Sequence, residues 1–105
     1  MSSTTYNKLV RDKIPEIIEQ TGKTCVCSIL KCEEYLAELN RKLTEELNEY
    51  SDTGAIEELV DIYEVIQAIL KYYDMSISEF EKICLDKRNA RGGFEKRIFL
   101  QSVNE

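Results

Sequence analysis

The sequence predicts a mainly α-helical protein, a bundle of about four helices with a small two-stranded β ribbon. Leucines recur at three- and four-residue steps between residues 36 and 47, which is typical of a helix with one apolar face. The stretch 56–70 is apolar on nearly all sides. The 105 residues include only one proline and four glycines, so long linkers are not expected. This length suits one hydrophobic core, and we expect a single domain spanning residues 1–105.

The helix boundaries follow from turn and capping residues. Asp12 is placed to cap the first helix, and residues 51–54, Ser-Asp-Thr-Gly, should end the second helix and cap the third. Ser76 and Glu79 form a capping-box pattern at the start of the fourth helix. The expected helices span residues 12–20, 32–50, 55–73, and 76 to just before Gly92.

Two segments outside these helices predict strands. Residues 24–30 are rich in β-branched and small apolar side chains, and residues 94–100 alternate imperfectly between apolar and polar. Because an isolated strand is not stable by itself, we expect the two segments to pair as the β ribbon.

The charge and hydropathy of the chain limit its location and its partners. Lys and Arg number 14 against 20 Asp and Glu, and the net charge of -6 argues against binding a nucleic acid polymer or an anionic membrane. The N-terminus lacks the apolar core of a secretory signal, and no apolar run approaches the roughly 20 residues that span a bilayer. We therefore expect a cytoplasmic protein.

The four cysteines are expected to be reduced, small and buried apolar residues, as in most cytoplasmic proteins. The alternative is a zinc site built on Cys25, Cys27 and Cys32. The chain has no histidine, the usual ligand spacing is missing and Cys84 is remote, so the zinc alternative is the weaker one.

Two pairs of acidic residues stand out on the two central helices. Glu46 and Glu49 are three residues apart, as are Glu58 and Asp61, so each pair lies on one side of its helix. Two such helices packed together would gather four negative charges, which is costly unless a cation lies between them. Oxygen ligands favour a hard divalent cation, so the pattern predicts a Mg²⁺ site with a substrate phosphate as the metal's partner.

The alternative is that these acids are ordinary solvated surface charge with helical ion pairs. Helical geometry turns Glu46 and Glu58 toward the apolar stripes, whereas Glu45, Glu57 and Glu64 should point to water. Asp61 also lies near the polar face, so geometry supports it least. Lys42 is placed to form an ion pair with Glu46 one helical turn away, and this pair is compatible with either interpretation.

The two acidic segments resemble a known family. Residues 45–49 match the motif EExxE and residues 58–61 match ExxD, a motif pair typical of the MazG-like all-α nucleoside triphosphate pyrophosphohydrolases. The opening YNKLVRDKIPEIIE and the closing RGGFEKRIFL resemble its phosphoribosyl-ATP pyrophosphohydrolase-like subgroup. The resemblance covers nearly the whole chain. It departs in one respect, because only eight residues separate Glu49 from Glu58, fewer than is common in the superfamily.

The resemblance implies a function and a set of ligands. It implies Mg²⁺, with Mn²⁺ as a substitute, held by Glu46, Glu49, Glu58 and Asp61, and hydrolysis of a nucleoside triphosphate between its α- and β-phosphates. The expected role is removal of modified or non-standard nucleotides. Glu49 is our candidate for the general base toward the attacking water. The chain lacks histidine and any nucleophile-plus-base pattern, which argues against a covalent mechanism.

Basic residues near both ends of the chain are the candidates for binding the phosphates. Arginine suits bidentate phosphate contacts, and glycine permits close backbone approach. The alternative for Lys87 and Arg88 is that they only complement the C-terminal end of their helix. The candidates are Lys8, Arg11, Lys13, Arg88, Arg91 and Lys96, with Lys87 and Arg97 nearby.

Two further expectations concern assembly and competing functions. The third helix is more apolar than a single 105-residue bundle easily buries, so we expect a homodimer or a homotetramer. The competing functions are phosphoribosyl-ATP hydrolysis and a catalytically silent helical interaction module.

Overall fold

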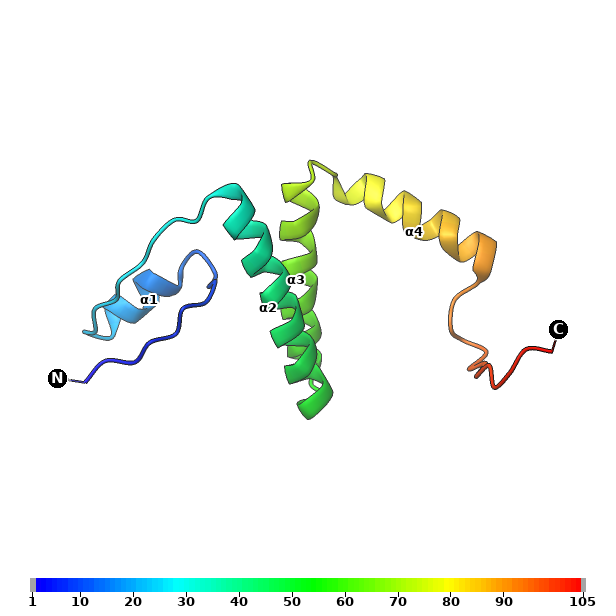
Figure 1. Cartoon of the computed structure of the whole chain (residues 1–105), viewed down its shortest axis with the longest axis horizontal. Coiled ribbons are helices and arrows are strands. Elements are labelled where there is room, and N and C mark those ends of the chain that lie inside the picture. Colours follow the sequence, from blue (N-terminus) through cyan, green and yellow to red (C-terminus); the bar gives the residue numbers. More distant parts are fainter. Residues whose placement is uncertain (1, 105) are drawn as a thin grey trace.

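The computed structural model describes residues 2–104, and this part of the chain is all-α. Its four helices are α1 (Ile14–Gln20), α2 (Cys32–Thr53), α3 (Ile56–Tyr72) and α4 (Ile77–Arg91). The number and order of the helices confirm the prediction from sequence. In Figure 1, α2 and α3 run antiparallel at the centre, and α1 and α4 extend away on opposite sides.

The α2–α3 hairpin contains the core of the chain. Leu39 of α2 is only 2% exposed, and Val65 and Leu70 of α3 are also buried. The helices are joined by residues 54–55 alone. Gly54 adopts a left-handed conformation with φ 65°, and its N–H donates to the Tyr50 carbonyl at 2.7 Å, which closes the end of α2.

Several helix ends differ from the prediction. The second helix continues to Thr53 instead of ending at residue 50, because the left-handed Gly54 and not the preceding polar residues stops it. The third helix begins after Ala55 without a side-chain cap. Lys13, not Asp12, occupies the N-cap position of α1, again without a side-chain cap.

The capping box of α4 is confirmed. The Glu79 N–H donates to Ser76 Oγ at 3.1 Å, and the Ser76 N–H donates to Glu79 Oε1 at 3.1 Å. These two bonds satisfy backbone donors that would otherwise lack partners at the start of the helix.

The predicted β ribbon is wrong for the described residues. Neither residues 24–30 nor residues 94–100 form a strand. The two segments lie at opposite ends of the molecule in Figure 1, so neither meets a partner at strand spacing. The second segment instead turns back on itself, where the Arg97 N–H donates to the Phe94 carbonyl and Arg97 has φ 56°. Val26, Ile29 and Phe94 are fully or almost fully exposed.

The chain is elongated, and its helices do not close into a bundle by themselves. The radius of gyration is 18.7 Å, whereas a compact domain of this length has about 13 Å. The accessible surface is 9931 Å², against about 6,100 Å² for a compact monomer of this mass. Packing between the described helices is confined to α2 with α3 and to a small contact of α3 with α4.

A helix that crosses a membrane must be about 20 residues long and predominantly apolar. Among the described residues, no helix is both long enough and apolar enough to cross a bilayer.

Candidate metal centre

Three acidic side chains of the α2–α3 hairpin converge between the two helices. Glu46 of α2 and Glu58 and Asp61 of α3 each place a carboxylate oxygen within 4.8 Å of the other two. Ligands on opposite sides of one Mg²⁺ lie about 4.2 Å apart, because each bond is about 2.1 Å. Small side-chain adjustments would therefore bring these oxygens to metal-binding distance.

Glu46 is the most unusual residue of the centre, since it is a carboxylate with only 5% exposure. Its Oε1 lies 3.3 Å from Lys42 Nζ, the helical pair expected from the sequence. Its Oε2 is buried without any hydrogen-bond partner. Burial raises the pKa of the Glu46 carboxyl, Lys42 opposes the rise and the charge of Glu49 adds to it. A buried oxygen that lacks a donor, next to two further carboxylates, suits a cation.

Glu49 belongs to a second cluster on α2. Oxygens of Glu45, Glu46 and Glu49 also lie within 4.8 Å of one another. Glu46 thus belongs to both groups, and the other three predicted carboxylates, of Glu49, Glu58 and Asp61, are each grouped with it. Glu49 is exposed, whereas Glu58 and Asp61 are partly buried. Asp61, which helical geometry supported least, lies in the group with Glu58.

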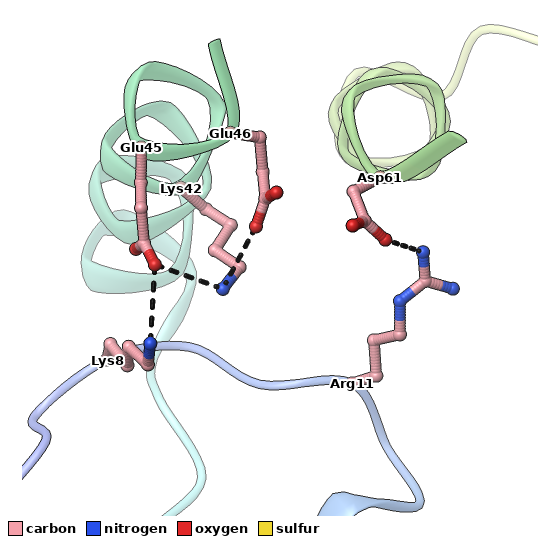
Figure 2. Close-up of polar contacts among 6 residues, drawn as sticks. All are labelled: Lys8, Arg11, Lys42, Glu45, Glu46 and Asp61. Atoms are coloured by element: carbon pink, nitrogen blue, oxygen red, sulfur yellow. Dashed lines mark hydrogen bonds and ion pairs between the residues drawn. The ribbon is translucent and has the colours of Figure 1, made fainter. Parts of the chain in front are cut away.

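Cations from the N-terminus reach this acidic centre. We call residues 7–13 the strap, because this segment without helix runs past the open side of the hairpin before α1 (Figure 2). Arg11 Nη2 lies 2.7 Å from Asp61 Oδ1, and Arg11 Nη1 lies 3.9 Å from Glu64 Oε1. Lys8 Nζ lies 3.3 Å from Glu45 Oε1. Two of the basic residues predicted to bind substrate therefore lie at the predicted metal centre.

The remaining basic candidates lie elsewhere in the single chain. Lys13 is exposed and lines an open pocket of about 310 Å³ together with Arg11. Arg88 and Arg91 are exposed in the last turn of α4, and Lys96 is exposed beyond it. Figure 1 shows that α4 leads away from the α2–α3 hairpin, so these three residues do not meet the carboxylates within one chain.

Glu45 is a residue whose surroundings were not foreseen. It was expected to point to water, yet its side chain is only 31% exposed. It is 3.3 Å from Lys8 Nζ and 3.7 Å from Lys42 Nζ. The helical wheel of α2 locates the side that packs on α3, but it contains no information about a segment that docks from 37 residues away. The first Glu of the EExxE pattern was the available signal.

The cysteines do not form a metal centre in the described part of the chain. Cys25 and Cys27 place their sulfurs 3.9 Å apart, but no group of three metal-binding side chains there includes a cysteine. The expectation of buried cysteines is wrong for Cys27, Cys32 and Cys84, which are exposed. Cys27 lies before α2, Cys32 is the first residue of α2 and Cys84 lies on α4.

Comparisons with known proteins add little to this geometry. No family model matches the chain, and no solved structure matches it. An uncharacterized protein of Mycolicibacterium smegmatis is 50% identical over 42 residues, which is 40% of this chain and 43% of that protein. The matched stretch thus spans less than half of either protein, and no activity is known from this relative's name.

Proposed function

We propose that this protein is a Mg²⁺-dependent nucleoside triphosphate pyrophosphohydrolase, which yields a nucleoside monophosphate and pyrophosphate. The observation that carries the proposal is the buried Glu46 Oε2, which lacks a partner and adjoins Glu58 and Asp61. The resemblance of residues 45–49 and 58–61 to EExxE and ExxD supports the reaction class. The proposed role is clearance of modified nucleotides in the cytoplasm.

Each residue of the centre has a role in this proposal. Glu46, Glu58 and Asp61 hold the metal, and Glu49, in the neighbouring cluster, serves either as a fourth ligand or as the general base. A bound Mg²⁺, or Mn²⁺ in its place, would neutralise phosphate oxygens and make a bound water more acidic. Glu49 is exposed and lies outside the Glu46–Glu58–Asp61 group, which leaves its carboxylate able to accept the proton of the attacking water.

Basic residues supply the remaining countercharge to the triphosphate. Lys8 and Arg11 already lie at the acidic centre, and Lys13 lies beside Arg11 at the pocket near α1. Arginine can bind two phosphate oxygens at once through its planar fork. Arg88, Arg91 and Lys96 could serve a site only if a second copy of the chain brought them to it.

The exposed surface supports a homodimer or a homotetramer. Ile56, Val60 and Tyr63 of α3 are 71%, 58% and 50% exposed, and they recur at three- and four-residue steps on one side of the helix. Apolar side chains in such a row are typical of a subunit interface. The surface of about 9,900 Å² compared with about 6,100 Å² for a compact monomer leaves ample area for one.

The proposal is tested by measuring pyrophosphate release from standard, damaged and phosphoribosyl-linked nucleotides, with and without Mg²⁺. We expect Mg²⁺-dependent release that falls at least 100-fold in Glu46→Gln, Glu58→Gln and Asp61→Asn. Glu57→Gln is the matched control, because Glu57 is exposed and next to Glu58 in sequence. Absence of release on every nucleotide, or equal release by Glu46→Gln, would contradict the enzyme.

Two alternative functions are phosphoribosyl-ATP hydrolysis and a catalytically silent interaction module. Preference for the phosphoribosyl-linked nucleotide would assign phosphoribosyl-ATP hydrolysis. The silent interaction module is favoured by one observation, which is that Lys8, Arg11 and Lys42 already neutralise part of the acidic centre. Calorimetry separates this module from the enzyme, because a module has no need to bind Mg²⁺.

A further inference from the structure

The contact between the strap and the acidic centre leads to an inference that rests on the proposed metal site. We propose that the strap is a latch that divalent metal must open. In this proposal Arg11 neutralises Asp61 in the metal-free protein, leaves it when the metal binds, and then becomes a ligand for a nucleotide phosphate. Metal binding would thus convert a residue that blocks the site into one that recruits the substrate.

The first step is competition for Asp61. Arg11 Nη2 is 2.7 Å from Asp61 Oδ1, a short, charge-assisted contact. The same carboxylate belongs to the group that would hold the metal. A divalent ion on Glu46, Glu58 and Asp61 would place two positive charges beside the guanidinium, and this repulsion disfavours simultaneous occupation.

The second step is that Arg11, with the strap, can leave the acidic centre more easily than Lys42 can. Lys42 belongs to α2, where its backbone is fixed and its side chain is only 19% exposed. Arg11 is 51% exposed and lies in a segment without helix, whose ion pairs to the hairpin are those of Lys8 and Arg11 in the described structure. Segments with few buried contacts are those that open at low cost.

The third step is the destination of Arg11. Arg11 and Lys13 line the open pocket of about 310 Å³, and Asp12 and Glu64 also line it. These two acids repel a free phosphate, so the two cations of the strap do not by themselves make a strong anion site. A nucleotide would need the charge of the metal as well, and the proposal therefore implies that metal binds before nucleotide.

The test compares Mg²⁺ affinity and nucleotide affinity in the same variants. Arg11→Ala should bind Mg²⁺ about 2- to 5-fold more tightly than the wild type, because the competing ion pair is lost. With saturating Mg²⁺, it should bind a non-hydrolysable α,β-methylene nucleotide at least 10-fold more weakly. Arg11→Lys, which keeps a competing positive charge, should bind Mg²⁺ like the wild type and more weakly than Arg11→Ala. Lys23→Ala, which removes an exposed charge beyond α1, should change neither affinity by more than 2-fold.

Limited trypsin digestion gives an independent measure of the strap. Mg²⁺ should accelerate cleavage after Lys8 and Arg11 relative to cleavage after Lys23 in the same sample. Mg²⁺ binding with equal or weaker affinity in Arg11→Ala, or with unchanged cleavage of the strap, would overturn the latch and leave the metal site intact. Absence of Mg²⁺ binding to the wild type and to Arg11→Ala would overturn both.

Discussion

At the residue scale, the buried carboxylate of Glu46 suits the proposed metal site but lowers the stability of the folded protein. Its carboxylate is 5% exposed, one oxygen pairs with Lys42 and the other has no partner. Removing a charged group from water without full compensation is unfavourable, and the proposed metal ion would offset this cost by supplying the missing positive charge. The metal-free wild type should therefore be less stable than a variant that carries a neutral side chain at this position.

The pH dependence of stability provides a test of Glu46. Burial raises the folded-state pKa of Glu46 above its unfolded value, so the folded state holds the proton more tightly. The contribution of the Glu46 carboxyl to stability is fully present below the pKa that it has in the unfolded state. It is lost as the pH rises through the higher pKa that it has in the folded state. In EDTA, Glu46→Gln should therefore unfold at higher urea concentration than the wild type at pH 7. The two proteins should converge near pH 4, where the wild-type carboxyl is protonated.

A Glu57→Gln control should show no such pH-dependent gain, because Glu57 is exposed. Lower stability of Glu46→Gln at pH 7 would mean that the Lys42 pair outweighs the cost of burial. Adding Mg²⁺ should reverse the order of the two proteins, since Glu46→Gln loses a ligand.

At the scale of elements, the α2–α3 hairpin holds all of the buried apolar side chains among the described residues. Leu39 is 2% exposed and packs in the hairpin, where Val65 and Leu70 are also buried. Leu39→Ala should lower the free energy of unfolding by about 2–5 kcal/mol, because truncation leaves a cavity as well as losing buried surface. Urea unfolding at fixed protein concentration would measure this loss.

Ile83→Ala is the control for the hairpin core, because Ile83 is 51% exposed on α4. It should cost less than about 1 kcal/mol. A loss at Ile83 as large as that at Leu39 would show that α4 is packed in the folded protein in solution, through contacts that a single chain does not provide.

The elements also show which features were predictable from sequence. Periodicity located α2, apolar content located α3, and capping and turn residues located α1 and α4, because all of these signals are local. The β ribbon failed because strands need partners, and local composition cannot reveal whether residues 24–30 ever meet residues 94–100. The grouping of Glu46 with Glu58 and Asp61 was foreseen because the two helices that bear them are adjacent in the sequence and were expected to pack together. The docking of Lys8 on Glu45 was not foreseen, because it joins residues that are distant in the sequence.

At the scale of the whole molecule, the elongated shape predicts assembly. Val60 is 58% exposed in the apolar row of α3. Val60→Glu would place a charge in the proposed interface, and it should convert an oligomer into a monomer while leaving the helical content unchanged. Size-exclusion chromatography with light scattering at micromolar concentration would measure the mass, and circular dichroism would measure the helical content.

Lys23→Glu also makes the chain more negative, but outside the α3 row, and it should leave the oligomer intact. A wild-type protein that elutes only as a monomer would contradict the assembly. In that case the open arrangement of α1 and α4 would itself be the form of the protein in solution.

The turn at Gly54 has a consequence for the order in which this protein forms. Only residues 54–55 separate α2 from α3, so closing the hairpin requires little loss of chain entropy. Short-range closure of this kind is among the fastest events in folding. Glu46, Glu58 and Asp61 all lie on this hairpin, within 15 residues of one another in sequence. We therefore expect the carboxylates to meet early, so that the proposed metal site forms on a nascent hairpin before the proposed association of subunits.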